Sequence, residues 1–457
     1  MKNLGIKTKP VIFSLIAICA AALIFWRVAN PSRTEVVSHA AAAVPKIAFE
    51  KFTLNNGLTV IVHEDHRSTG TAINLWYHVG TKNERPDSHG IAHLSEHLMF
   101  TGTPRIGEDV AKVLKRMGIS NATASTDSDR TRVMMDVPEA SFEGALRLVA
   151  ELMTGTAEAL TESKVDTVRR QIEQEVARNN GSPYIFAEDL LRSRIYPAEH
   201  PYSRHPLRSI DGINSISLAK VKEWFKTYYC PANAVLVVAG DLKPQTVRRE
   251  IEQYFGGIPR GQALNRAQPS IPRAPSIKPE TVAGKIPRQR LYMVWIVPGY
   301  TEPDIDRLDL IRHYLTLKIQ ERKPSEQPEP EVDISLNSHE LCGEFQIRLT
   351  ASTSEQLDLL EREVKRQIEE VMSQGPAPAE LEEIKTELLS SLSSDLEQIG
   401  GFGGKAGLLA ISEVFAGDPD HYRTAYQRML DTTPADMKAV SSRWLAASPY
   451  VLHVKNQ

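Results

Sequence analysis

The stretch GIAHLSEHLMFTGT, residues 90–103, places His93, Glu96 and His97 within five positions. On an α-helix, residues four apart lie on one face and residues three apart lie close to it, so these three side chains are predicted to be neighbours. Gly90, directly before the apolar residues, indicates the start of that helix. The alternative interpretation is three polar residues on the wet side of an ordinary helix.

Two imidazoles one helical turn apart can bind zinc from one side, and a carboxylate beside them can take a proton from water. The order His-x-x-Glu-His is the inverse of the commoner His-Glu-x-x-His zinc motif. We therefore interpret His93 and His97 as metal ligands and Glu96 as a general base. A catalytic zinc needs a third protein ligand and an open fourth position, so one more ligand is expected elsewhere in the chain.

Candidates for the third ligand lie in a second predicted helix, residues 160–180. The apolar stripe of this helix consists of Val165, Val168, Ile172 and Val176. At about 100° per residue, Glu175 lies about 65° from the centre of the stripe and Glu173 about 95° from it. Glu175 is nearer the buried side, but the helical pattern alone leaves both glutamates open.

The composition is that of a globular protein with mixed charges. The chain has 457 residues, which is too long for one compact core and predicts two or three domains. The net charge is −3, and no basic stripe of the kind that nucleic acids require is present. Three cysteines exclude a disulfide-built scaffold, and free thiols at Cys230 and Cys342 are favoured over a bond between them.

The N-terminus has the pattern of an export signal. Lysines precede the unbroken apolar run 11–26, and Arg27 follows it. Residues 1–28 are therefore predicted to be a signal anchor, or a signal peptide if cleaved, followed by a polar, alanine-rich spacer at 29–45. Because flanking lysines stay in the cytoplasm, the body of the protein is expected in the bacterial periplasm, held at the inner membrane or secreted.

The rest of the chain mixes strands with helices, which predicts the α+β class. Turn dipeptides and β-branched residues predict strands at 58–65, 71–80, 233–241 and 290–297. Apolar periodicity predicts further helices at 107–117, 139–155, 353–373 and 378–397.

An internal echo suggests that one domain occurs twice. A helical segment with an aromatic end and a following strand occurs at 217–229 and again at 433–445. A proline-rich segment, 259–285, is predicted to be an extended linker. We therefore expect two tandem homologous α/β domains, each a mostly antiparallel sheet flanked by helices. The zinc motif lies in the first, 46–258, and is absent from the second, 286–457.

With these residues in view, the chain resembles the insulinase/pitrilysin family of zinc metallopeptidases, and within it the short branch that includes mitochondrial processing peptidase. Residues 76–103 resemble the zinc-helix region of that family, 121–131 its substrate-strand segment and 200–241 the end of its first domain. The resemblance extends over about 46–457. It implies a peptidase with one zinc ion per chain, whose enclosed space admits short or unfolded peptides.

The resemblance also implies roles for single residues. It assigns the zinc to His93 and His97 and the general base to Glu96. It selects Glu175 as the third ligand, because an aliphatic residue precedes it by three positions and Pro183 follows it by eight.

In the segment 121–131, which resembles the substrate strand of the family, the peptide substrate is expected to add as a strand along a sheet edge near Asn121, Ala122 and Thr123. Turn chemistry is the alternative for Asn121 and Thr123.

Two departures from the family pattern bear on activity. The second glutamate that many members carry one heptad before the third ligand is Val168 here. The segment 317–338 lacks tyrosine and glycine, although many active members steady the peptide there with an arginine and a tyrosine. A non-catalytic, peptide-binding or structural subunit of the same fold is therefore the alternative function. A related partner chain that completes the site, in a homo- or heterodimer, is expected.

Overall fold

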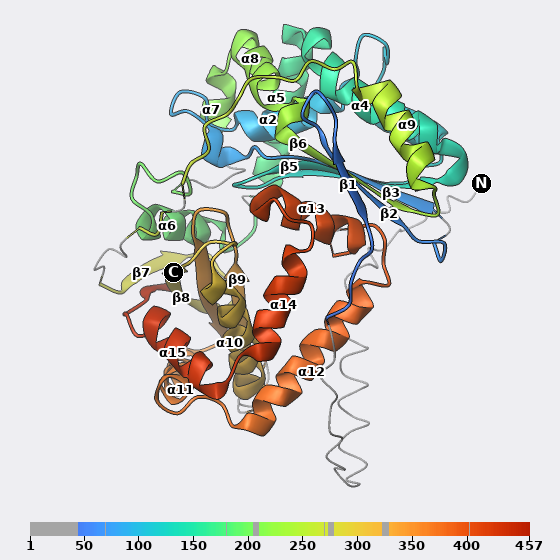
Figure 1. Cartoon of the computed structure of the whole chain (residues 1–457). Coiled ribbons are helices and arrows are strands. Elements are labelled where there is room, and N and C mark those ends of the chain that lie inside the picture. Colours follow the sequence, from blue (N-terminus) through green and yellow to red (C-terminus); the bar gives the residue numbers. More distant parts are fainter. Residues whose placement is uncertain are drawn as a thin grey trace, which may run out of the picture. The chain divides into compact units, whose positions relative to one another are not determined.

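The computed structural model describes residues 44–457, except 69, 180, 204–209, 269, 273–277, 322–328 and 402. Two β-sheets with flanking helices confirm the α+β class (Figure 1). In this described part, no helix combines the length and the apolar character needed to cross a membrane. The predicted anchor, residues 1–28, lies outside it and stays a prediction.

The first sheet has six strands in the order β1-β2-β6-β3-β5-β4, and only β2 and β6 are parallel neighbours. The strands are β1 (Glu50–Thr53), β2 (Thr59–Glu64), β3 (Gly70–Tyr77), β4 (Asn121–Thr126), β5 (Thr131–Pro138) and β6 (Ala234–Gly240). The helices of the same part of the chain are α2 (Ile91–Met99), α3 (Val110–Arg116), α4 (Phe142–Ala159), α5 (Glu162–Asn179), α6 (Ile185–Ile195), α7 (Ile210–Ser215), α8 (Leu218–Tyr228) and α9 (Pro244–Phe255).

The second sheet has five strands in the order β7-β11-β8-β10-β9, and only β7 and β11 are parallel. The strands are β7 (Glu280–Gly284), β8 (Gln289–Val297), β9 (Glu331–Asn337), β10 (Gly343–Ala351) and β11 (Tyr450–Asn456). The helices are α10 (Pro303–Gln320), α11 (Ser354–Ser373), α12 (Pro378–Asp395), α13 (Lys405–Ala416), α14 (His421–Asp431) and α15 (Pro434–Trp444).

The two sheets share one topology. Strands β2 to β6 recur as β7 to β11, with the same spatial order and the same sense at every pairing. The echoed segments become α8 and α15, each directly before the last strand of its sheet. One detail of the linker prediction is wrong, because residues 280–284 form β7. Their main chain pairs with β11, and this pairing overrides the extended-linker composition around them.

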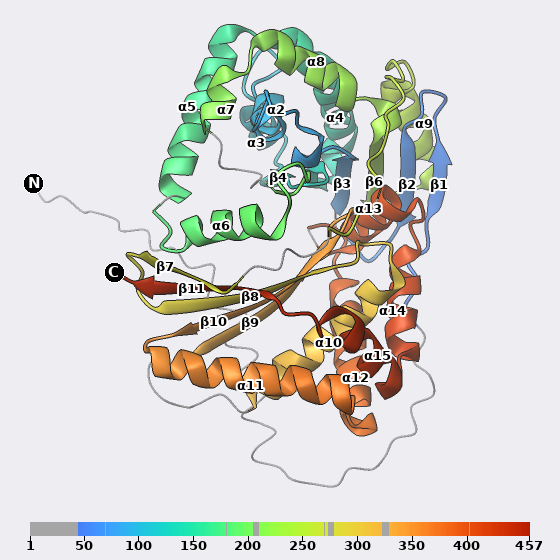
Figure 2. The same ribbon diagram turned by 90° about the vertical axis from the view of Figure 1, so that its left-hand side faces the viewer.

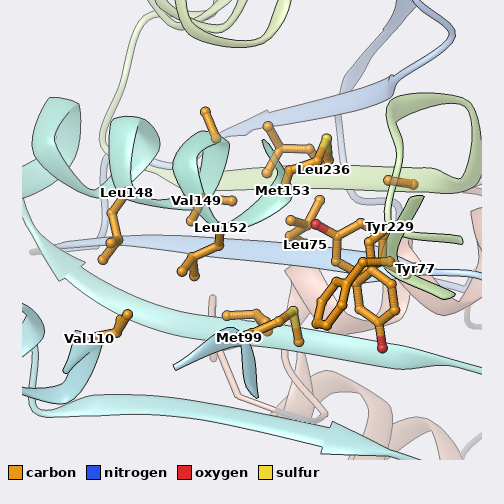
Figure 3. Packing of buried hydrophobic residues seen from close by; sticks show 14 of the residues in the cluster. Leu75, Tyr77, Met99, Val110, Leu148, Val149, Leu152, Met153, Tyr229 and Leu236 are labelled. Carbon is orange, nitrogen blue, oxygen red and sulfur yellow. The ribbon is translucent and has the colours of Figure 1, made fainter. Parts of the chain in front are cut away.

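The core of the first part of the chain fixes α2 against the sheet. Leu148 and Leu152 of α4, Leu75 of β3, Leu236 of β6 and Met99 of α2 belong to one buried cluster, part of which Figure 3 shows. All five are at most 3% exposed. Each fully buried side chain of this size contributes about 1.5–3 kcal/mol, so this packing holds the helix that carries the histidine motif.

Helices cross between the two parts of the chain. Leu409 and Ala410 of α13 pack with Val237 of β6, on the face of the first sheet opposite α2 (Figure 1). Conversely, α6 of the first part packs on the second sheet, where Leu191 contacts the cluster that contains Leu452 of β11 (Figure 2). The domain ranges expected from the sequence predict neither of these two contacts. Apolar periodicity shows that one face of a helix is buried, but it does not show which sheet covers that face.

An ion pair joins the two parts at a buried point. Lys405 Nζ binds Asp65 Oδ2, and the two residues are 4% and 8% exposed. Arg67, whose side chain is largely exposed, binds the same carboxylate with an Nη2–Oδ2 distance of 2.7 Å. The hydrogen bond from Arg67, assisted by that from Lys405, holds the pKa of Asp65 well below its usual range.

We expect Asp65→Asn to lower the free energy of unfolding by about 3–5 kcal/mol, because it leaves the buried Lys405 ammonium without its carboxylate. Lys405→Met should cost much less, since Arg67 still neutralises Asp65. Because the folded pKa of Asp65 is depressed, its contribution is present above about pH 4 and is lost as the pH falls further. Urea unfolding of both variants between pH 3 and 8 measures this, and equal losses would contradict the assignment.

Candidate metal centre

The helix that carries the motif begins at a backbone position that suits glycine. Gly90 has a φ of 85°, in the left-handed region that a side chain disfavours. The carboxylate of Glu84 accepts hydrogen bonds from the N–H groups of Gly90 and Ala92, at 3.0 and 3.1 Å. Glu84 therefore occupies the N-terminus of α2, where free N–H groups and the helix dipole favour a negative charge.

His93, His97 and Glu175 come together in the structure. The Nε2 atoms of the two histidines lie 3.0 Å apart. Glu175 Oε2 lies 3.8 Å from Nε2 of His93 and 3.4 Å from Nε2 of His97. The helices that carry them, α2 and α5, pack against each other, so the contact spans about 80 residues of sequence through one helix pair. Three donor atoms of these residue types within 4.8 Å could hold a metal ion.

The spacing of the three donors fits zinc. Tetrahedral zinc with bonds of about 2.0–2.1 Å places neighbouring ligand atoms about 3.4 Å apart. The three observed separations, 3.0, 3.4 and 3.8 Å, bracket that value. His93 is 3% exposed, whereas about a quarter of the side-chain surface of His97 and Glu175 is open, so one side of the triangle can be reached from solvent.

The local electrostatics keep both imidazoles neutral. Burial, together with the neighbouring His97, lowers the pKa of His93 to about 4. Burial also lowers the pKa of His97, against the opposing effect of the Glu175 carboxylate. A neutral imidazole is the form that binds a metal, so neither histidine has to lose a proton near neutral pH before it can act as a ligand.

Glu96 lies beside the triangle and against the sheet. Burial raises the pKa of Glu96 to about 7, against hydrogen bonds from Thr126; the negative charge of Glu175 also raises it. Thr126 is the last residue of β4, and Arg132 of β5 is close enough to affect the same carboxylate. Sequence reasoning missed both residues, because no spacing rule connects α2 with the far end of a strand.

The rival candidate for the third ligand lies elsewhere. Glu173 accepts a hydrogen bond from Asn214 Nδ2 at 3.1 Å and is not part of the donor cluster. Val168, at the position of the family's second glutamate, is 1% exposed and belongs to the core, as the predicted apolar stripe requires.

The predicted substrate segment is an edge strand. Asn121, Ala122 and Thr123 open β4, and the turn alternative for Asn121 and Thr123 is wrong. β4 pairs with β5 on one side, and no strand among the described residues pairs with its other edge. An unpaired edge exposes main-chain donors and acceptors, and α2, which carries the two histidines, packs against β4.

Comparisons with known proteins indicate the family of this chain. The family model described as Insulinase (Peptidase family M16) matches residues 59–205, and the one described as Peptidase M16 inactive domain matches 215–388. The chain is 25% identical to the zinc protease PqqE of Helicobacter pylori over 425 residues, which is 89% of this chain and 92% of that protein. It is 24% identical to an uncharacterised zinc protease of Streptomyces coelicolor over 412 residues, 87% of each chain.

Solved structures share the fold. The crystal structure of a protease from Helicobacter pylori superposes with a TM-score of 0.76 at 25% identity, covering 90% of this chain and all of that one. The first half of the periplasmic protease PqqL of Escherichia coli has a TM-score of 0.71 at 16% identity, with 92% and 94% covered. Both family models, the relatives and the fold agree: this chain belongs to the insulinase family of peptidases, family M16.

Proposed function

We propose that this chain is a zinc-dependent endopeptidase that cleaves short or unfolded peptides. The observation that carries the proposal is the donor triangle of His93, His97 and Glu175, with Glu96 directly beside it. When bound there, zinc would supply a Lewis acid that makes water a better nucleophile and polarises a carbonyl group. The names of the relatives as zinc proteases support the choice of metal.

The residues of the chain divide the remaining work. Glu96 accepts the proton of the attacking water and passes it to the leaving amine, so that one carboxylate serves as base and then as acid. Thr126 positions this carboxylate through its hydrogen bonds.

The substrate enters as an extra strand. A peptide added to the free edge of β4 at Asn121, Ala122 and Thr123 gains main-chain hydrogen bonds that any sequence can make. A folded protein cannot present such a strand without unfolding locally, which restricts the substrates to short or unfolded chains.

The proposal extends to organisation and location. The zinc-binding domain comprises about 46–258 and the second domain 286–457, and a related chain pairs with this one. Two comparisons support pairing: this chain covers only 48% of the full PqqL structure, and it is 25% identical over 233 residues to the cytochrome b-c1 complex subunit 1 of Caenorhabditis elegans. The basic and apolar N-terminus supports a periplasmic location of the body, and the periplasm is the compartment named for PqqL.

Zinc content and peptidase activity, measured on one sample of the full chain with a mixture of unstructured peptides, test the proposal. We expect one zinc ion per chain and cleavage that a chelator stops. Zinc without cleavage would favour the alternative, a binding subunit or one half of a heterodimeric peptidase. A chain without zinc would overturn the proposal altogether.

A further inference from the structure

Two opposite charges flank the edge strand on one face of the first sheet. Arg132 of β5 is directly opposite Ser125 of β4, and Asp136 is opposite Asn121. Side chains four apart on a strand lie on the same face, about 13 Å from each other. Arg132 Nε donates to Ser125 Oγ at 2.7 Å, and Asn121 Nδ2 donates to Asp136 Oδ2. Both charges therefore reach across to the strand whose outer edge is unpaired.

The positive charge lies at the catalytic end of β4, the end formed by Ser125 and Thr126. The guanidinium of Arg132 is half-buried, 5.2 Å from the ring centroid of Trp76, and interacts with the charge of Glu96. Its neighbour Arg130 binds Asp127 with an Nε–Oδ2 distance of 2.9 Å, and the same carboxylate also acts on Arg132. The two guanidinium groups thus share one fixed carboxylate besides Glu96. A guanidinium held in one orientation binds carboxylates strongly, because its paired donors match their geometry.

The negative charge lies at the distal end of β4, the end formed by Asn121. A pocket of about 810 Å³ opens there, lined among others by Asp136, Glu397, Gly400 and Gly401. Asp65 is the third carboxylate of the wall, and it binds both Arg67 and the buried Lys405. Three carboxylates therefore face two cations, and the charge at this end is negative overall. A side chain at position 400 would collide with the carboxylate of Asp136, so glycine there lets the wall come close. The space accommodates a lysine or arginine side chain.

Between these ends the same face is neutral. Met134 of β5 is 2% exposed, and Thr123 is its partner on β4. A peptide strand along β4 alternates its side chains with the same period as β5, so residues four apart would meet the two charged ends.

We propose that this charged strip selects substrates with opposite charges at positions i and i+4: an acidic side chain at Arg132 and a basic one in the pocket at Asp136. The proposal rests on the proposed function, because it requires a peptide added to the edge of β4. It names a substrate class that the family fold alone does not: unfolded segments with an acid and a base four residues apart.

Four peptides of one neutral background test the proposal, carrying acid and base, base and acid, two acids or two bases at i and i+4. We expect one opposed-charge peptide to be cleaved with a kcat/KM about 10-fold above both like-charged peptides, the size of one charge-assisted contact. The preferred order of the acidic and the basic residue shows in which direction the peptide strand binds. The double variant Arg132→Glu, Asp136→Lys should prefer the reversed order, a result that general damage to the fold cannot produce.

Milder variants and a binding measurement complete the test. Arg132→Gln and Asp136→Asn should each abolish the preference. Arg249→Glu reverses one positive charge at an exposed position of α9, as Arg132→Glu does on β5, and should leave the preference unchanged. Binding of the same peptides to the Glu96→Gln variant separates the strip from catalysis. If the dissociation constants follow the expected charge preference but the native chain cleaves no peptide, only the proposed function is contradicted. If the constants are equal for all four peptides, the proposed charge selection is overturned.

Discussion

Replacing Glu96 with glutamine is expected to reduce kcat for peptide cleavage by about 10³- to 10⁴-fold while zinc stays bound. Glutamine has nearly the same shape and can still contact Thr126, but it cannot accept the proton of water. The donors His93, His97 and Glu175 are unchanged, so the metal content should remain at that of the native chain. Turnover with an unstructured peptide and zinc by mass spectrometry, on the same preparation, measure both quantities.

Two further variants show whether the loss comes from the general base. Glu96→Asp keeps a carboxylate but shortens its reach, so we expect activity between those of the native chain and the glutamine variant. Glu162→Gln makes the same chemical change at an exposed position in the first turn of α5 and should not affect turnover. Unchanged turnover in the Glu96→Gln variant would rule out the mechanism, whatever the zinc content.

Local patterns of the sequence are sufficient for most individual elements. The helix expected at 160–180 is α5, and its predicted stripe, Val165, Val168, Ile172 and Val176, is at most 3% exposed. The strands expected at 71–80 and 233–241 are β3 and β6. These predictions hold because each depends on one period, 3.6 or 2 residues, which the local chain itself determines. The same patterns did not reveal that α13 covers the first sheet and α6 the second, since period carries no information about the partner.

The candidate site divides in the same way. His93, Glu96 and His97 are close because one helical turn brings them together, so the sequence alone could place them. Thr126 and Arg132 reach the same site only because the edge strand β4 passes beside α2 and β5 pairs with β4. Such approach depends on the register of the sheet and the position of the helix over it, which no local pattern specifies. The third ligand could be predicted only in part, because the position of Glu175 on the helical face favoured it over Glu173 only slightly.

Replacing Glu175 with glutamine is expected to weaken zinc binding by at least about 100-fold. This is more than the loss in affinity when a residue that only hydrogen-bonds to a metal ligand is replaced. The change removes the only charged donor of the triangle, whose oxygen lies 3.4 and 3.8 Å from the two imidazole nitrogens. An amide oxygen carries no net charge to offset that of the divalent ion, so the remaining histidines hold it poorly. Titration of the metal-free variant with zinc, against a competing chelator, gives the affinity.

Glu173→Gln is the matched control, two residues away on the same helix. Its carboxylate binds Asn214 on α7 and is not part of the donor cluster, so zinc affinity and turnover should stay within about twofold of the native values. Loss of metal in both variants would indicate that α5 had been disrupted, and circular dichroism would detect the loss of helix. Loss of metal in Glu173→Gln alone would transfer the third ligand to Glu173 and require α5 to rotate, which its buried valine stripe opposes.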